Sequence, residues 1–109
     1  MDQDGIRYMR LMVFFDLPVL EKEQRKIANQ FRNFLKKDGY DMVQLSVYSR
    51  ACRGMDAVGK HLSRLKANLP PAGCVRVLQM TEKQYGRMQI LIGARRKKER
   101  IASEQLLLL

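Results

Sequence analysis

The segment YMRLMVFFD, residues 8–16, decides the fold. It is short and rich in β-forming residues, and a Leu-Pro pair closes it, so it predicts a strand. Side chains alternate between the two faces of a strand, which here sets Leu11, Val13 and Phe15 against Met12 and Phe14. Because both faces are apolar, we expect this strand to be central in its sheet and covered on both sides.

Over residues 21–37 the apolar residues no longer alternate as in a strand but recur at the spacing of a helix. Ile27, Phe31, Phe34 and Leu35 recur at the spacing of one helix face. Acidic residues fall in the first turn and lysines in the last, in agreement with the helix dipole, and Gly39 is suited to end the helix in a left-handed conformation.

The rest of the chain supplies further strands and a second helix. Period-two alternation predicts strands over 42–50, 74–80 and 87–93, and Asp56 is placed to begin a helix that ends before Pro70. TEKQYG between the last two strands predicts a turn of helix. We interpret these elements as the α+β, ferredoxin-like arrangement βαββαβ, with a four-stranded antiparallel sheet and both helices on one face.

The chain length of 109 residues fits one compact domain, which we place at residues 1–93, with 1–7 as a flexible leader. Residues 94–109 then form a basic segment and a C-terminal strand. The first residues are acidic and polar, no apolar run could span a bilayer, and the two cysteines are widely spaced. We therefore expect a cytoplasmic protein with reduced thiols and no membrane partner.

The formal charge of +10 is the first functional indication, since excess lysine and arginine suit a phosphate backbone. A basic stripe follows the exposed side of the predicted first helix, and a second cluster follows residue 94. A merely solvated surface would also explain such a stripe. The candidate nucleic-acid-binding residues are Lys22, Arg25, Lys26, Arg32, Lys36, Arg95, Arg96, Lys97, Lys98 and Arg100.

The second apolar face of the central strand needs a cover, because two helices on one side leave the other side bare. A face-to-face homodimer is the economical answer. The leucine-rich end of the chain could add a strand to a sheet edge, in the same chain or in a partner, although a frayed terminus is the alternative. The expected interface residues are Met12, Phe14, Leu106, Leu107, Leu108 and Leu109.

Asp16 has an unusual setting, since it ends an apolar strand on the face of Met12 and Phe14. A carboxylate there could hold magnesium or another divalent cation, and a two-fold axis could bring two copies together. Such an ion could orient water and stabilise charge on a phosphate. A loop-capping aspartate is the alternative. The sequence contains no Walker loop, nucleophile elbow or second acidic cluster, and the stacking aromatics of an RNA-recognition module are absent from 74–80.

These stretches together carry a family resemblance: MRLMVFFDLPV (9–19), EKEQRK and FRNFLKK in the first helix, MVQLSVYSR (42–50) and LPPAGCVRVLQMTEKQYGRM (69–88). In this order and spacing they resemble the small CRISPR-associated adaptation proteins, the Cas-two family, especially its type II members. The leader and the RRKKER segment depart from the family pattern.

The resemblance implies a ferredoxin-like homodimer whose C-terminal strand packs on the partner subunit. It also implies a magnesium-dependent endonuclease acting on RNA or double-stranded DNA, with Asp16 as the catalytic metal ligand. The family further bridges dimers of the CRISPR integrase during spacer acquisition, which gives the integrase and prespacer duplex DNA as partners. A toxin-like ribonuclease that cleaves mRNA on the same fold is the alternative function.

Overall fold

The structure is a computed structural model and describes residues 7–93. Three predictions fall outside these residues: the leader at 1–7, of which only Arg7 is described, the basic cluster at 95–100, and the strand at Leu106–Leu109. None of the helices within 7–93 combines the length and apolar character needed to cross a membrane.

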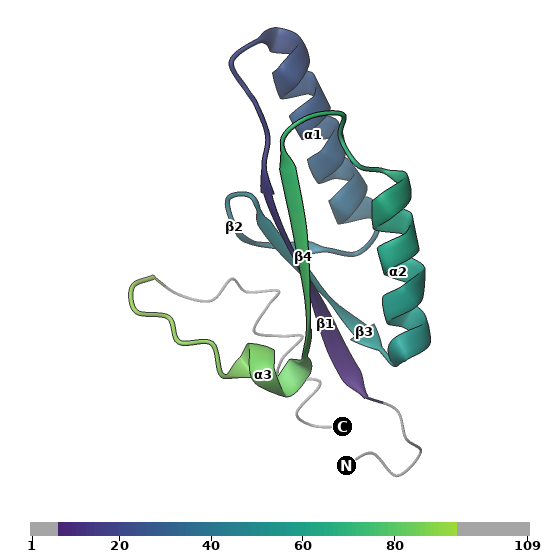
Figure 1. Ribbon diagram of the computed structural model, residues 1–109. Coiled ribbons are helices and arrows are strands. Elements are labelled where there is room, and N and C mark those ends of the chain that lie inside the picture. Colours follow the sequence, from purple (N-terminus) through teal and green to yellow (C-terminus); the bar gives the residue numbers. More distant parts are fainter. Residues whose placement is uncertain (1–6, 94–109) are drawn as a thin grey trace.

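One four-stranded antiparallel sheet carries the fold, with the strand order β2-β3-β1-β4 (Figure 1). Its strands and helices follow along the chain as β1 (Tyr8–Asp16), α1 (Lys22–Lys37), β2 (Asp41–Gln44), β3 (Val47–Arg53), α2 (Met55–Ala67), β4 (Cys74–Thr81) and the short α3 (Glu82–Gly86). The predicted βαββαβ arrangement and the central position of the first strand are confirmed.

The predicted strand over 42–50 is wrong, because this stretch is a hairpin. Strand β2 ends at Gln44, which pairs with Val47 at the start of β3. Between them Ser46 has a φ of 63°, a conformation usually taken by glycine or asparagine. The turn reverses the chain, so 41–53 supplies two of the four strands.

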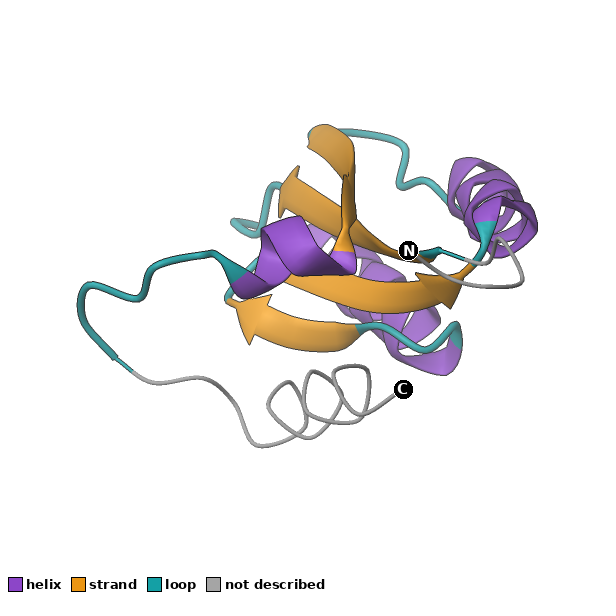
Figure 2. Ribbon diagram, turned by 90° about the horizontal axis from the view of Figure 1, so that it is seen from below, coloured by secondary structure: helices purple, strands orange, loops and turns teal. Residues whose placement is uncertain are grey.

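The predicted strand over 87–93 is also wrong: this segment has no strand partner within the described chain. Figure 2 shows it, in teal, leading away from the strands after α3. Its apolar side chains stay in solvent, with Leu91 91% and Ile92 94% exposed. β4 occupies the edge beside β1 instead.

The core lies between the sheet and the two long helices. Leu11, Val13 and Phe15 of β1 are buried there, as predicted, against α1 and α2. The Phe15 ring meets that of Phe31 edge to face, with centroids 5.2 Å apart. Leu35 of α1 completes this side of the core, and its burial is worth roughly 2 kcal/mol.

The end of α1 agrees with the prediction, whereas the start of α2 differs from it. Gly39 follows α1 with a φ of 93°, as expected for a residue that ends a helix. Helix α2 begins one residue before the predicted Asp56, after Gly54, and Asp56 lies in its first turn. Val58 and Leu65 of α2 are buried against the sheet side of the core.

The opposite face of the sheet, which we call the open face, is only partly covered. Arg10 points to it from β1, and its guanidinium pairs with both carboxylate oxygens of Glu82 in α3 at 2.8 Å. The same group donates to Ser49 Oγ at 3.0 Å and lies 4.2 Å from the centre of the Tyr85 ring. Helix α3 is thereby fixed over the end of the open face where β1 begins, and it leaves the Asp16 end uncovered.

Candidate nucleic-acid interface

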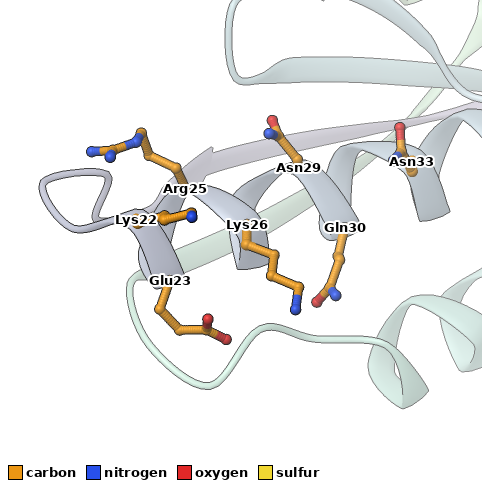
Figure 3. Close-up of a pocket in the computed structure, with 7 residues that line it drawn as sticks. All are labelled: Lys22, Glu23, Arg25, Lys26, Asn29, Gln30 and Asn33. Atoms are coloured by element: carbon orange, nitrogen blue, oxygen red, sulfur yellow. The ribbon is translucent and has the colours of Figure 1, made fainter.

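The first turns of α1 carry a shallow groove lined by cationic and amide side chains (Figure 3). The helix forms because apolar residues at helical spacing bury one side, so the polar residues share the outer side. Only one carboxylate is among the residues that line the groove: Lys22, Glu23, Arg25, Lys26, Asn29, Gln30 and Asn33. This surface can donate many hydrogen bonds to anionic oxygens.

Three of the five predicted α1 cations are therefore brought together, but they are not equivalent. Lys22 and Lys26 are exposed and have no hydrogen-bond or ion-pair partner within residues 7–93. Arg25 Nη1 instead donates to the carbonyl oxygens of Val19 at 3.2 Å and Leu20 at 2.8 Å. Arg25 thus holds the loop between β1 and α1 in addition to lining the groove.

The other two predicted cations of α1 lie outside the groove. Arg32 is half-buried, with its guanidinium 5.7 Å from the centre of the Phe15 ring and an Nη1 donating to Asn29 Oδ1 at 3.3 Å. Lys36 is exposed in the last turn. Arg32 therefore packs against the core in addition to carrying a charge. The predicted basic stripe consists of the groove and of two cations, Arg32 and Lys36, that lie outside it.

Asp16 ends β1 on the open face, and its side chain is exposed, as predicted. Cys74 is its partner across β4 and is also exposed. The backbone here is set by Gly73, whose φ is 94°: a Cβ on Gly73 would lie 2.5 Å from the Asp16 carbonyl oxygen. Only glycine fits against β1 in this way.

The donor set at Asp16 is sparse. Within residues 7–93 no three His, Cys, Asp or Glu side chains lie close enough together to hold a metal ion. One exposed carboxylate nevertheless fits magnesium, which keeps several waters and often takes one or two protein carboxylates together with phosphate oxygens. A single chain thus offers one hard ligand to a divalent cation.

The predicted dimer-interface residues on β1 differ in exposure. Met12 is only 5% exposed within the single chain, so a second chain could reach little of it. Phe14 is half-buried, and Leu78, which pairs with Met12 across β4, is 51% exposed. Phe14 and Leu78 therefore belong to the apolar surface of the open face that stays accessible, and the sequence did not single out Leu78.

The lone histidine of the sequence is buried. His61 Nδ1 lies 2.8 Å from Asp38 Oδ2, and Arg64 donates to Asp38 Oδ1 at 2.9 Å. Burial acts to raise the pKa of Asp38, but the hydrogen bonds from His61 and Arg64 outweigh it and leave the pKa below its usual value. Since Asp38 ends α1, this cluster ties α1 to α2 and is structural.

Comparison with known proteins gives consistent results. The family described as CRISPR associated protein Cas2 matches residues 9–88. A CRISPR-associated endoribonuclease Cas2 of Acidovorax ebreus is 56% identical over 85 residues, which cover 78% of this chain and 83% of that one. A second, of Ligilactobacillus salivarius, is 41% identical over 93% of this chain and its own full length.

A solved crystal structure of cas2 shares the fold, with a TM-score of 0.56 at 19% identity over 83% of this chain and 91% of the other. The family match spans most of the chain, and both relatives exceed 40% identity over most of their length. The chain belongs to the Cas2 family of CRISPR-associated proteins.

Proposed function

We propose that the chain is a subunit of the CRISPR adaptation machinery that holds prespacer duplex DNA by its phosphates and bridges integrase dimers. The α1 groove carries this proposal, because Lys22 and Lys26 present free ammonium groups beside a row of amides. Phosphate contacts of this kind position a duplex without reading its sequence. The basic residues at 95–100 add to the same charge, and membership of the Cas2 family supports the setting.

A homodimer is part of this proposal. The Asp16 end of the open face leaves Phe14 and Leu78 in contact with solvent, and a second copy would remove this apolar surface from water. Two copies would also double the number of cationic grooves along one duplex. The leucines at 106–109 are proposed to pack on the partner, as the resemblance implies.

A second proposed activity is magnesium-dependent cleavage of RNA or duplex DNA at Asp16. The exposed carboxylate at the end of β1 favours it, and both relatives carry the name endoribonuclease. Asp16 would hold the cation, which when bound supplies charge stabilisation to the phosphate and acidifies a water molecule. The residues of this chain would contribute position, because Gly73 fixes the backbone at Asp16.

Copurification with a CRISPR integrase from the same organism tests the bridging role. We expect a complex that duplex DNA stabilises. An integrase that never coelutes with the chain, with or without duplex, would contradict the bridging proposal.

Asp16→Asn separates the cleaving role from the bridging role, because an amide cannot replace the anionic ligand. Wild type and variant are compared for cleavage of RNA and duplex DNA with magnesium or chelator, and for spacer integration with the integrase. We expect cleavage to be lost and integration to be retained. Undiminished cleavage would remove Asp16 from the catalytic role, and lost integration in an intact complex would show that bridging requires the carboxylate.

A further inference from the structure

The loop between β1 and α1, residues 17–21, carries an exposed apolar tip at Val19 and Leu20. The loop is uncharged from Leu17 to Leu20, and Val19 is 47% and Leu20 89% exposed. Figure 1 shows the loop at the end of the domain that lies farthest from α3. Single exposed leucines are common on protein surfaces, so the meaning of this tip depends on its backbone and its neighbours.

The backbone of the tip is held by the helix that follows it. Arg25 Nη1 donates to the carbonyl oxygens of Val19 at 3.2 Å and Leu20 at 2.8 Å. The Glu21 backbone N–H donates to Gln24 Oε1 at 2.9 Å, in the capping box that begins α1. Both carbonyl groups of the tip thus have a donor within the chain. The two apolar side chains are presented on a fixed backbone, which lowers the entropy that a ligand must overcome.

The tip adjoins the cationic groove of α1. Leu20 comes two residues before Lys22, and Arg25, which holds the tip, also lines the groove (Figure 3). Glu23, the one carboxylate of the groove, is directed away from Arg25 in the same view. The combined surface therefore suits a ligand with anionic flanks and a less polar strip between them. Duplex DNA has this character, since phosphates border each groove and base edges form its floor.

We propose that Leu20 enters the minor groove of duplex DNA while the cations of α1 hold the bordering phosphates. Proteins that bind the minor groove place leucine and other apolar side chains there beside cations. The minor groove is only about 6 Å wide, so it admits a single side chain, whereas the major groove admits a whole helix. Two apolar side chains are, by contrast, a small surface for a protein partner.

This inference rests on the proposed function and adds a contact of a different chemical kind. An apolar side chain releases no counterions, so its contribution to affinity does not depend on salt, unlike that of Lys22 and Lys26. The proposed homodimer leaves the tip accessible. Leu17, at the base of the tip, packs against the core on the helix-covered side of the sheet, whereas the dimer uses the open face.

The test measures the affinity of the full chain for two fluorescein-labelled duplexes by fluorescence anisotropy, in chelator and at several salt concentrations. One duplex contains G·C pairs. The other has inosine in place of guanine, which removes an amino group from the minor groove and leaves the major groove unchanged. The variants are Leu20→Ser, Leu20→Met and, as matched control, Leu45→Ser. Leu45 lies in the β2–β3 turn and is 81% exposed, so its loss removes the same side chain from another part of the surface.

We expect Leu20→Ser to weaken duplex binding about tenfold, and Leu45→Ser to weaken it less than about twofold. The loss in Leu20→Ser should be equal at every salt concentration, so that the slope of log K against log salt concentration stays that of wild type. Leu20→Met should keep most of the affinity, because it conserves volume and apolar character. Circular dichroism melts confirm that every variant is folded.

The two duplexes test which groove is used. The wild-type chain should bind the inosine duplex more tightly, because the guanine amino group occupies the floor of the minor groove. Leu20→Ser should lose this preference. A tenfold loss without any preference in the wild type would overturn the assignment to the minor groove.

Failure of the inference and failure of the proposed function are distinguishable. If the wild-type chain binds duplex and Leu20→Ser matches the Leu45→Ser control, Leu20 is not a DNA contact. If Leu20→Ser keeps its duplex affinity but no longer coelutes with the integrase, the tip contacts protein and the inference is again overturned. A wild-type chain that binds neither duplex would overturn the proposed function, and this inference with it.

Discussion

Removal of the Glu82 carboxylate should destabilise the chain strongly, because it leaves a buried cation without its partner. The Arg10 side chain is 4% exposed and Glu82 13% exposed, and two 2.8 Å contacts join them. Breaking a buried ion pair from one side costs about 3–5 kcal/mol. Ser49 and the Tyr85 ring still face the guanidinium, so we expect the lower end, about 3 kcal/mol for Glu82→Ala.

The assay is urea unfolding followed by circular dichroism, at one fixed protein concentration because association alters apparent stability. In a thermal scan the same loss corresponds to a fall in Tm of about 12–24 °C for a domain of this size. Lys83→Ala is the matched control, since Lys83 is the exposed neighbour in the same helix, and it should change stability by less than about 0.5 kcal/mol.

Arg10→Met combined with Glu82→Ala should regain at least half of the lost unfolding free energy, because replacing a buried ion pair by apolar side chains often leaves stability unchanged. The reasoning is refuted if Glu82→Ala alone costs less than about 1 kcal/mol. It is equally refuted if the double variant is less stable than Glu82→Ala by itself.

Three further predictions concern single side chains. Burial raises the pKa of Tyr40 to about 12. From pH 10 to 12 the unfolded chain therefore loses a proton that the folded chain keeps, and the free energy of unfolding falls as the pH rises. Tyr40→Phe should remove that part of the fall, measured by urea unfolding. At neutral pH the same variant should be as stable as wild type or more stable, because the buried hydroxyl has no hydrogen-bond partner among residues 7–93. Gly73→Ala should destabilise the chain more than Gly54→Ala. Both glycines have a positive φ, but of the two only Gly73 would place its new Cβ against backbone atoms. Equal losses of unfolding free energy in denaturant would contradict the clash. Cys74 should react with iodoacetamide in the native protein while Cys52 does not, since Cys52 is buried and its burial raises the thiol pKa; mass spectrometry after digestion identifies the labelled thiol.

The sequence predicted the elements whose apolar period is continuous. Strand β1 and helix α1 were placed to within a residue, because their buried side chains repeat without interruption. It failed at the β2–β3 hairpin, where Leu45 and Ser46 form the turn without the glycine, proline or asparagine that signals one. It failed again at 87–93, because a strand-like pattern does not form a strand without a neighbour to pair with.

For the candidate site, the sequence pattern identified residues but not the contacts that they make in the fold. The helical spacing correctly placed Lys22 and Lys26 on one surface, whereas the engagement of Arg25 by the β1–α1 loop depends on backbone carbonyls that no pattern displays. Leu78 was missed because its position beside Met12 comes from the register between β1 and β4, which lie far apart in the sequence. Alternation in CVRVLQM places Leu78 on the face opposite to Val75 and Val77, but only the pairing shows what lies beside it.

The salt dependence of duplex binding tests the central claim, phosphate contact through the α1 groove, most directly. For Lys22→Gln/Lys26→Gln, the slope of log K against log salt concentration should become shallower by about 1.8, at about 0.9 for each lost contact. Lys60→Gln/Lys66→Gln, which removes the same charge from exposed positions of α2, should leave the slope close to wild type. A wild-type slope in the Lys22/Lys26 variant, or equal changes in both variants, would contradict a phosphate-binding groove on α1.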